Sequence, residues 1–517
     1  MPRPPEGAGG GKRAWVRVAL VVVLLCVVAG AFAYLGFDKY PATIGDNAEF
    51  AVIARSITAG KGFSYINHPE ERPATKYPPG FPLVLAGWSL LFGNSFVSLK
   101  LLLVLAYVLA VALTYLLARR LIGDNLAVVA ALMVASSTSF IRYSHIVLSE
   151  MPYALVSLVV IYLVLYRPDT RRNFILVAAL CVWAYYVRTV GGTLVLAVAI
   201  YYFLTSRKKY AIIILSALVV ASLAWSLRNY AATGEGSRYL SVLLKVDPYY
   251  PHKGNIDAVG LFARMGKNLL GYSGELIAFT VLPSYHVRVA GTEVSLARNV
   301  ISVAVVAFAA LGGLSLRREA KLINIYLLLY MLAYLIWPDV WMSDRFMVPI
   351  APIVAIYAVQ GIFKLSRMLG APRRAAAAVT VLVLLTNAYA LALYVKRDRG
   401  YTPLWANYIQ CAIWCAHNTD PEDLFVCRKP FFFSVFSERK TISYPFTRDH
   451  AEMQEYLEEW GADYIIVDYF GGPTGTTELY VLPVLLDMIG SVKTVYATGE
   501  PLNMVVKLNV PEEEAGN

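Results

Sequence analysis

The sequence is poor in charged residues: only 16% of its 517 residues are Asp, Glu, Lys or Arg, whereas 58% are hydrophobic. A soluble chain of this length would be expected to form three or four domains with charged surfaces. The composition excludes that class. Instead, apolar runs long enough to cross about 30 Å of hydrocarbon recur along residues 1–395.

The sequence also lacks a basic patch with interleaved aromatic residues, so we expect no nucleic acid among its partners. Its net charge is +11, from 46 basic and 35 acidic residues. The basic residues lie in short clusters between the apolar runs, as in the cytoplasmic loops of membrane proteins. The positive charge therefore indicates orientation in a membrane, with membrane lipids as the surroundings.

Cysteine is scarce: there are five, in no metal-ligand pattern with histidine. Cys26 and Cys181 lie inside apolar runs and are expected to be inert core residues. Cys411, Cys415 and Cys427 lie in a polar C-terminal tail. One disulfide is compatible with an oxidising compartment, but three cysteines cannot all pair within the chain.

A cleavable signal peptide is not expected at the N-terminus. Lys12, Arg13 and Arg17 precede an apolar run from Val18 to Leu35. This run is longer than the apolar core of a signal peptide. It predicts an uncleaved membrane helix whose N-terminus lies inside the cell.

Apolar length and flanking charge predict an α-helical polytopic membrane protein with about 11 transmembrane helices. Residues 81–93 are too few to span and predict an interfacial or re-entrant helix. The predicted spans are 15–37, 95–118, 124–141, 149–166, 173–188, 190–205, 209–230, 298–316, 321–337, 346–364 and 375–395.

The loops support this layout, because every short basic cluster falls on one side of it. The other side carries a first outer loop, 38–80, and a long outer segment, 231–297. An odd number of spans places the C-terminal tail opposite the N-terminus. We therefore predict a multi-pass protein of the cell membrane with a cytoplasmic N-terminus and an extracytoplasmic tail.

The tail, 396–517, differs in pattern from the membrane region, 1–395. Helical stretches at 403–416 and 448–460 alternate with strand-like runs that begin near residues 423, 463, 492 and 504. This alternation predicts a small α/β domain. No internal repeat is visible.

Ionisable residues beside a bilayer are energetically unfavourable and indicate function. In the first outer loop, Asp46 and Glu49 have the spacing of a capping box that starts a helix. The functional alternative, of equal weight and compatible with the cap, is a carboxylate held at the membrane surface as a general base. At the end of this loop, Lys76 precedes Tyr77 and paired prolines, and it either snorkels to headgroups or binds a lipid phosphate.

The loop before span 149–166 contains Arg142, His145, Ser149 and Glu150. Ser149 can cap the following helix, and Glu150 then benefits from the positive helix end. The functional alternative is a second acidic residue in an outer cavity. His145 alone is more often structural than catalytic.

Three arginines at outer helix ends run against the positive-inside trend: Arg188, Arg228 and Arg345. Together with Lys76 they suggest an anion held at the outer surface, because arginine matches phosphate in bidentate geometry. The structural alternative for Arg345 is a pair with its neighbour Asp344.

These segments resemble the glycosyltransferase C (GT-C) superfamily, in the group of protein O-mannosyltransferases and 4-amino-arabinose lipid A transferases. The resemblance covers about residues 15–395 and extends to the tail. The motifs that carry it are GDNAEF (45–50), KYPPGFP (76–82), the segment 142–152 with Ser149-Glu150, VRT (187–189), the segment 225–230 with Arg228-Asn229, DRF (344–346) before Pro349, RKP (428–430) and ADYIIVD (462–468).

The resemblance implies a role for most of these residues. Asp46 occupies the position of the catalytic carboxylate, and Glu150 matches a second acidic position. Lys76, Arg188 and Arg345 match residues that bind the lipid-linked phosphate. Tyr77, in the motif of Lys76, and Arg228, in the segment 225–230, are further candidates for donor binding. Glu49, Arg142 and His145 are candidates for contact with substrate or metal.

At two points the sequence differs from branches of this superfamily. Lipid A transferases often carry a basic residue where this chain has Glu49, which argues against a specific assignment to amino-arabinose transfer. The tryptophan-rich signature of oligosaccharyltransferases is absent, which argues against that branch.

The expected function is inverting transfer of a sugar from a polyprenyl-phosphate carrier to a hydroxyl acceptor on a protein, lipid or glycan. A divalent metal is compatible with the family, but the spacing of Asp46, Glu49, His68 and Glu150 predicts no defined site. Transporters or flippases of a lipid-linked substrate, and assembly proteins without turnover, are the alternatives. Transporters commonly show internal repeats, which this chain lacks.

Overall fold

The computed structural model describes residues 8–234, 242–282, 296–371, 373–396, 400–471 and 475–509. The chain forms two compact units. The helical unit comprises Met1–Asp38, Lys100–Arg228 and Asp257–Arg397. The sheet unit comprises Lys39–Leu99, Asn229–Ile256 and Asp398–Asn517. The division predicted at residue 395 remains a prediction.

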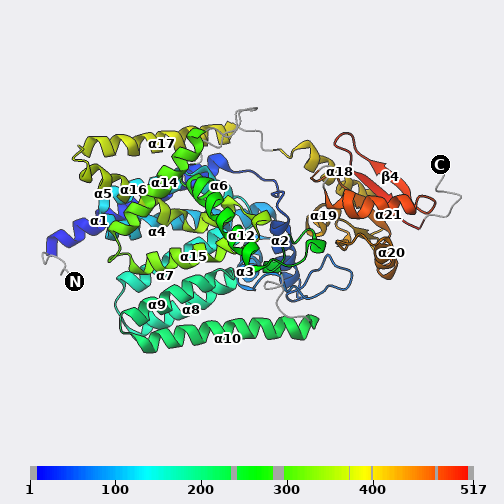
Figure 1. The fold of residues 1–517 in the computed structure, drawn as a ribbon, viewed down its shortest axis with the longest axis horizontal. Coiled ribbons are helices and arrows are strands. Elements are labelled where there is room, and N and C mark those ends of the chain that lie inside the picture. The colour runs from blue at the N-terminus through cyan, green and yellow to red at the C-terminus, as the bar shows by residue number, and fades with distance from the viewer. Residues whose placement is uncertain are drawn as a thin grey trace. The chain divides into compact units, whose positions relative to one another are not determined.

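A helix occupies each range predicted as a span (Figure 1). The helices of these ranges are α1 (Ala8–Gly36), α4 (Phe96–Ile122), α5 (Asp124–Ser136) with α6 (Thr138–Ser144), α7 (Glu150–Tyr166), α8 (Arg171–Val187), α9 (Gly191–Leu204), α10 (Lys208–Thr233), α14 (Leu296–Ser315), α15 (Lys321–Leu335), α16 (Ala351–Met368) and α17 (Arg373–Lys396).

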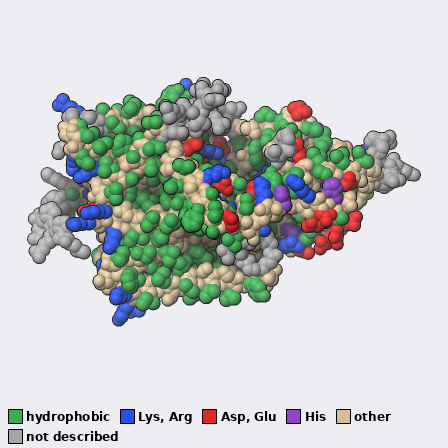
Figure 2. Space-filling view, viewed as in Figure 1, with side chains coloured by type: hydrophobic (Ala, Val, Ile, Leu, Met, Phe, Trp, Pro, Cys, Tyr) green, Lys and Arg blue, Asp and Glu red, His purple; other side chains and the backbone are tan. Residues whose placement is uncertain are grey.

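Within the described ranges, five helices are long and apolar enough to cross a membrane, and six if the bent pair α5 and α6 counts as one. The pair bends by 58°, because the Ser137 side chain accepts the Phe140 N–H and starts a new helix. Hydrophobic side chains are abundant on the face of the helices shown in Figure 2, as expected of surfaces that contact lipid. The chain is a multi-pass membrane protein, while the number of 11 spans remains a prediction.

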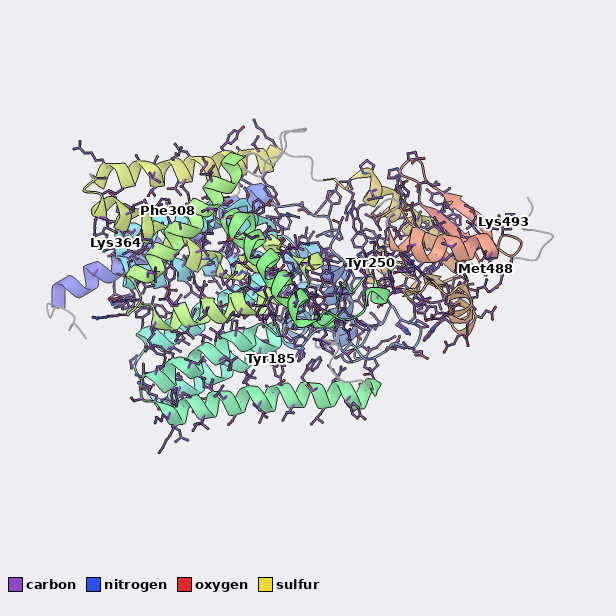
Figure 3. The ribbon with its side chains drawn as sticks, viewed as in Figure 1. Tyr185, Tyr250, Phe308, Lys364, Met488 and Lys493 are labelled. Carbon is purple, nitrogen blue, oxygen red and sulfur yellow. The ribbon has the colours of Figure 1, made fainter. Side chains whose placement is uncertain are left out.

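Helices α14 and α16 pack closely because two glycines face the neighbouring backbone. A Cβ built on Gly361 would lie 1.9 Å from the carbonyl oxygen of Phe308, which lies on α14 (Figure 3). A Cβ on Gly312 would lie 1.9 Å from the carbonyl oxygen of Tyr357. Small residues at such contacts are the usual way for membrane helices to approach each other.

The segment 231–297, predicted only as a long outer segment, contains helix α12 (Ala258–Gly271), a π-helical turn (Tyr272–Leu276) and α13 (Ile277–Phe279). Its parts 235–241 and 283–295 lie outside the described residues. The buried Asn268 of α12 donates to the carbonyl oxygens of Tyr334, Leu335 and Trp337 at 3.3, 2.9 and 2.8 Å. It thereby satisfies the C-terminal end of α15, whose last carbonyls have no partner within the helix.

Replacing Asn268 by Leu is expected to lower the free energy of unfolding by about 1–3 kcal/mol, because buried carbonyl groups lose their donor. Thermal unfolding of the purified protein in detergent measures this. The matched control is Asn418→Leu, since Asn418 is an exposed residue at the end of its helix whose side chain donates to the carbonyl of Trp414 in that same helix. Equal melting temperatures for the two variants would contradict the capping role.

The tail forms the predicted α/β fold. Five strands make one sheet in the order β2-β1-β3-β5-β4, in which β1 pairs in parallel with β2 and β3, and β5 pairs antiparallel with β3 and β4. The elements are α18 (Pro403–Asn418), β1 (Leu424–Val426), α19 (Pro430–Ser437), β2 (Lys440–Ile442), α20 (His450–Glu459), β3 (Tyr464–Val467), a π-helical turn (Thr477–Val481), α21 (Leu482–Asp487), β4 (Lys493–Ala497) and β5 (Met504–Lys507).

The segment Lys39–Leu99 of the sheet unit contains helices α2 (Gly45–Thr58) and α3 (Gly80–Phe92). Helix α3 confirms the short apolar helix predicted at 81–93. The cysteines Cys411, Cys415 and Cys427 are buried free thiols, so the disulfide considered from the sequence is not formed. Their place in the hydrophobic core of the sheet explains why they are buried.

Candidate active site

The first group of site residues lies at the start of α2. The helix begins at Gly45 with Ile44 as its N-cap, and no side chain caps it. Asp46 therefore lies inside the first turn. The capping box predicted for Asp46 and Glu49 is wrong, because the helix starts two residues earlier and both carboxylates bind Lys76 instead.

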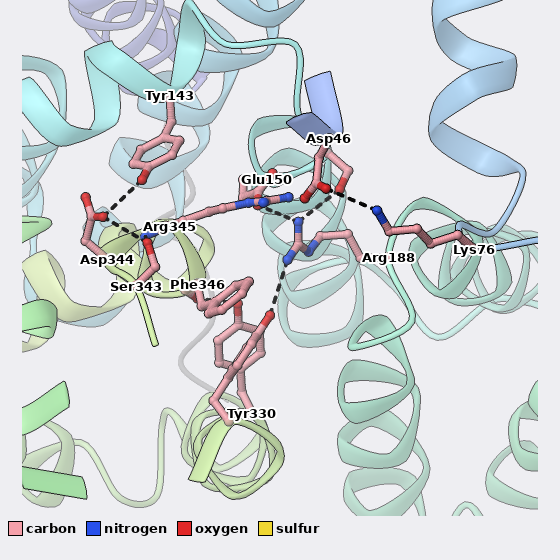
Figure 4. A network of polar contacts seen from close by, with 12 residues as sticks. Asp46, Lys76, Tyr143, Glu150, Arg188, Tyr330, Ser343, Asp344, Arg345 and Phe346 are labelled. Atoms are coloured by element: carbon pink, nitrogen blue, oxygen red, sulfur yellow. Dashed lines mark hydrogen bonds and ion pairs between the residues drawn. The ribbon is translucent and has the colours of Figure 1, made fainter. Parts of the chain in front are cut away.

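We call Asp46, Glu49, Tyr65 and Lys76 the Lys76 cluster (Figure 4 draws Asp46 and Lys76). Lys76 Nζ lies 2.7 Å from Glu49 Oε2 and 3.3 Å from Asp46 Oδ1. The Tyr65 hydroxyl donates to Glu49 Oε1 at 2.7 Å. The Glu49 side chain is 2% exposed and that of Asp46 is 28% exposed. Glu49 is thus held on both oxygens, while Asp46 is the more accessible carboxylate and the better placed for proton transfer.

Burial and charge oppose each other in this cluster. Burial raises the pKa of Glu49, and the nearby Lys76 only partly offsets this. Neighbouring atoms partly desolvate the ammonium of Lys76, although its side chain is 53% exposed, but Glu49 and Asp46 outweigh this and raise the pKa of Lys76 above its ordinary value. Lys76 therefore stays positively charged, and its ion pair with Asp46 restrains the Asp46 side chain.

Replacing Tyr65 by Phe is expected to lower the free energy of unfolding by about 1–3 kcal/mol, because it leaves a buried carboxylate oxygen without its donor. Thermal unfolding is the measurement. The control is Tyr456→Phe, which removes an exposed hydroxyl that donates to the Ser443 carbonyl. A Tyr65→Phe melting temperature equal to that of the control would contradict the proposed support of Glu49.

The second group lies in the helical unit, around Glu150 at the start of α7. We call Ser149, Glu150, Arg188, Tyr334 and Arg345 the Glu150 cluster. Arg188 NH1 lies 2.7 Å from Glu150 Oε1, and Arg345 Nε contacts the same oxygen (Figure 4). Arg188 also donates to Ser149 Oγ at 2.9 Å and to the Tyr334 hydroxyl at 3.3 Å.

Glu150 is fully buried, whereas Arg188 and Arg345 are 11% and 14% exposed. Two guanidinium groups against one carboxylate leave one positive charge in excess. The carboxylate holds the two arginines next to each other, and their partly exposed edges can receive an anion. The arrangement has the charge and the fixed geometry that an anion site requires.

Two structural alternatives for this region are wrong. Ser149 occupies the N-cap position of α7, but its side chain does not cap the helix and accepts from Arg188 instead. Arg345 pairs with Glu150, while Asp344 accepts from the Tyr143 hydroxyl at 3.0 Å and from Ser343 at 3.2 Å. The side chains of Ser149 and Arg345 thus interact with residues far away in the sequence and not with their sequence neighbours.

Comparison with known proteins identifies a family model and solved structures that resemble this chain. Residues 76–225 match the family model described as dolichyl-phosphate-mannose-protein mannosyltransferase. The structure of ArnT from Cupriavidus metallidurans bound to undecaprenyl phosphate is similar at 15% identity and a TM-score of 0.59, over 94% of this chain and 97% of that one. No curated protein matches the chain by sequence.

Archaeal enzymes share the architecture as well. The oligosaccharyltransferase AglB from Archaeoglobus fulgidus, in complex with an inhibitory peptide and a dolichol-phosphate, is 14% identical with a TM-score of 0.53. That similarity covers 94% of this chain and 74% of AglB. The chain has the GT-C fold. The resemblance drawn from its sequence motifs is therefore confirmed.

The remaining candidate residues of this GT-C chain have local contacts. Lys76 lies over the ring of Tyr77 at 4.6 Å, and Tyr77 packs on Phe50 with ring centroids 4.3 Å apart. Arg228, near the end of α10, lies 5.1 Å from the ring centroid of Trp225.

Two further candidates lie at the C-terminal end of α6, before α7. Arg142 is exposed, and its guanidinium lies 5.6 Å from the ring centroid of Tyr143. His145 is buried and packs edge-on against Phe37 at 5.3 Å, in keeping with the structural role that its sequence context favoured.

Sequence reasoning missed the two tyrosines that support the clusters, Tyr65 and Tyr334. Tyr65 lies 16 residues from Glu49, and Tyr334 lies 146 residues from Arg188. No spacing rule links residues so far apart. In the described part of the chain, no group of three or more His, Cys, Asp or Glu side chains could hold a metal ion.

Proposed function

We propose that this GT-C chain is an inverting glycosyltransferase that moves a sugar from a polyprenyl-phosphate carrier to a hydroxyl acceptor on the outer face of the cell membrane. The observation that carries the proposal is the Glu150 cluster, in which a buried carboxylate holds Arg188 and Arg345 as an anion site. Similar structures were solved with undecaprenyl phosphate and with a dolichol-phosphate, which supports a prenyl phosphate as this anion.

The arginines are assigned to the leaving group. When the bond between the anomeric carbon and the phosphate oxygen breaks, negative charge grows on the polyprenyl phosphate. Arg188 and Arg345 would stabilise that charge from fixed positions, and preorganised donors of this kind usually supply the largest catalytic contribution. Lys76, Tyr77 and Arg228 complete the set to which we assign donor binding, on the family resemblance.

Asp46 is assigned as the general base. Its side chain is the more exposed carboxylate of the Lys76 cluster, and Lys76 fixes its position. Asp46 would accept the proton of the acceptor hydroxyl while the hydroxyl oxygen bonds to the anomeric carbon. A single displacement inverts the anomeric centre and releases polyprenyl phosphate. The acceptor is a protein, a lipid or a glycan.

A transfer assay tests the proposal. Membranes that contain the protein are incubated with radiolabelled polyprenyl-phospho-sugars, one hexose or pentose at a time. Movement of label to an acceptor, with inversion at the anomeric carbon, is the expected result. Transport of labelled lipid across the membrane without transfer of the sugar would overturn the proposal in favour of a flippase.

A further inference from the structure

The tail packs directly on the first outer loop inside the sheet unit. The rings of Phe431 on α19 and Tyr65 lie 4.9 Å apart. Asn67 donates its side-chain amide to Thr441 Oγ1 at 2.9 Å, and its carbonyl accepts the Thr441 N–H at 2.7 Å. These contacts fix the start of α19 against the loop that contains the Lys76 cluster.

Lys429, the residue before α19, lies at this contact. A Cβ built on Gly45 would lie 3.8 Å from Lys429 Cδ, so the lysine stem packs over the residue that precedes Asp46. Lys429 is partly buried. Among the described residues, its ammonium forms no ion pair, and the neighbouring carboxylate of Asp468 pairs at 3.7 Å with Arg428 NH1.

The two lysines near Asp46 therefore differ. Lys76 forms ion pairs with two carboxylates. Burial and the neighbouring Arg428 lower the pKa of Lys429, while Asp46 and Asp468 act in the opposite direction. A partly desolvated cation without an ion pair is unfavourable until an anion joins it. Lys429 has this property and lies beside the proposed base.

We propose that Lys429 binds the phosphate group of the polyprenyl-phosphate beside the Lys76 cluster of its own unit. The inference rests on the proposed function and assigns a role to the tail. It also gives a reason for the Arg428-Lys429-Pro430 motif. Arg428 binds Asp468 and a backbone carbonyl of its own domain, that of Phe470, and Pro430 starts α19, which leaves Lys429 to face the loop.

Binding of undecaprenyl phosphate to the full-length protein in nanodiscs tests the inference without any sugar transfer. Lys429→Met is expected to weaken this binding about tenfold or more, because a hydrogen bond to a charged group is lost. Lys429→Arg should retain it to within about threefold, because the charge remains. The matched control is Lys507→Met, which removes an exposed lysine at the end of β5.

Undecaprenol and inorganic phosphate complete the experiment. Undecaprenol, which lacks the phosphate, should bind wild type and Lys429→Met equally. If Lys429→Met weakens the binding of undecaprenol and undecaprenyl phosphate equally, the inference is overturned, because Lys429 then acts by packing against its surroundings and not by binding the phosphate. An effect confined to inorganic phosphate would overturn it in favour of a free anion. If wild type binds undecaprenyl phosphate and Lys429→Met binds it equally well, the inference fails while the proposed function stands.

Discussion

Asp46→Asn is expected to reduce sugar transfer by about 10²–10⁴-fold, the usual contribution of a general base. The amide keeps the shape of the side chain but cannot accept the proton of the acceptor hydroxyl. Because Glu49 still pairs with Lys76 at 2.7 Å, the cluster should stay in place. Transfer of label from a polyprenyl-phospho-sugar, measured with equal amounts of protein, gives the result.

Two controls separate chemistry from folding in this experiment. Asp487→Asn removes an exposed carboxylate of the same unit and should transfer at the rate of wild type. The melting temperature of Asp46→Asn should match that of wild type to within a few degrees, because Asp46 is partly exposed. A folded Asp46→Asn protein with undiminished transfer would remove Asp46 from the mechanism.

Glu150→Gln should produce the largest change in stability. The substitution removes the only negative charge of the Glu150 cluster and leaves Arg188 and Arg345 facing each other in a buried place. Breaking a buried ion pair by removing one partner costs about 3–5 kcal/mol, and here two pairs share one carboxylate. We expect a large fall in melting temperature and loss of transfer.

Thermal unfolding in detergent measures the effect of Glu150→Gln. Glu455→Gln, on the exposed face of α20, changes the same side-chain type and should leave the melting temperature unaltered. If Glu150→Gln unfolds at the wild-type temperature, the two arginines do not depend on Glu150. Other residues would then have to position the two arginines.

The sequence predicted the positions of the apolar helices well, because a lipid-facing helix must satisfy its own backbone and must be apolar along its length. The sequence did not predict α12, in which apolar side chains are exposed and polar side chains are buried. Val259 and Phe262 are 77% and 72% exposed, whereas the polar Arg264 and Asn268 are buried. A rule that places apolar residues inside could not identify this helix as part of the packed structure.

The candidate site could be predicted as a set of residues, but not as two clusters. Arginines at outer helix ends stood out because they break the charge bias of the loops. The sequence did not indicate that Glu150 is the partner of these arginines, because Arg345 and Glu150 are 195 residues apart. The capping hypothesis for Asp46 failed for a local reason, since the start of a helix is uncertain by a residue or two from sequence alone.

The contacts of Asn67 with Thr441 and of Tyr65 with Phe431 make the first loop and the tail one folding unit, although about 370 residues separate them. They are consequently not interchangeable modules. A chimera that carries the tail of a relative should fold only if residues 39–99 come from the same relative. Selection on acceptor or donor preference in one segment will therefore constrain substitutions in the other.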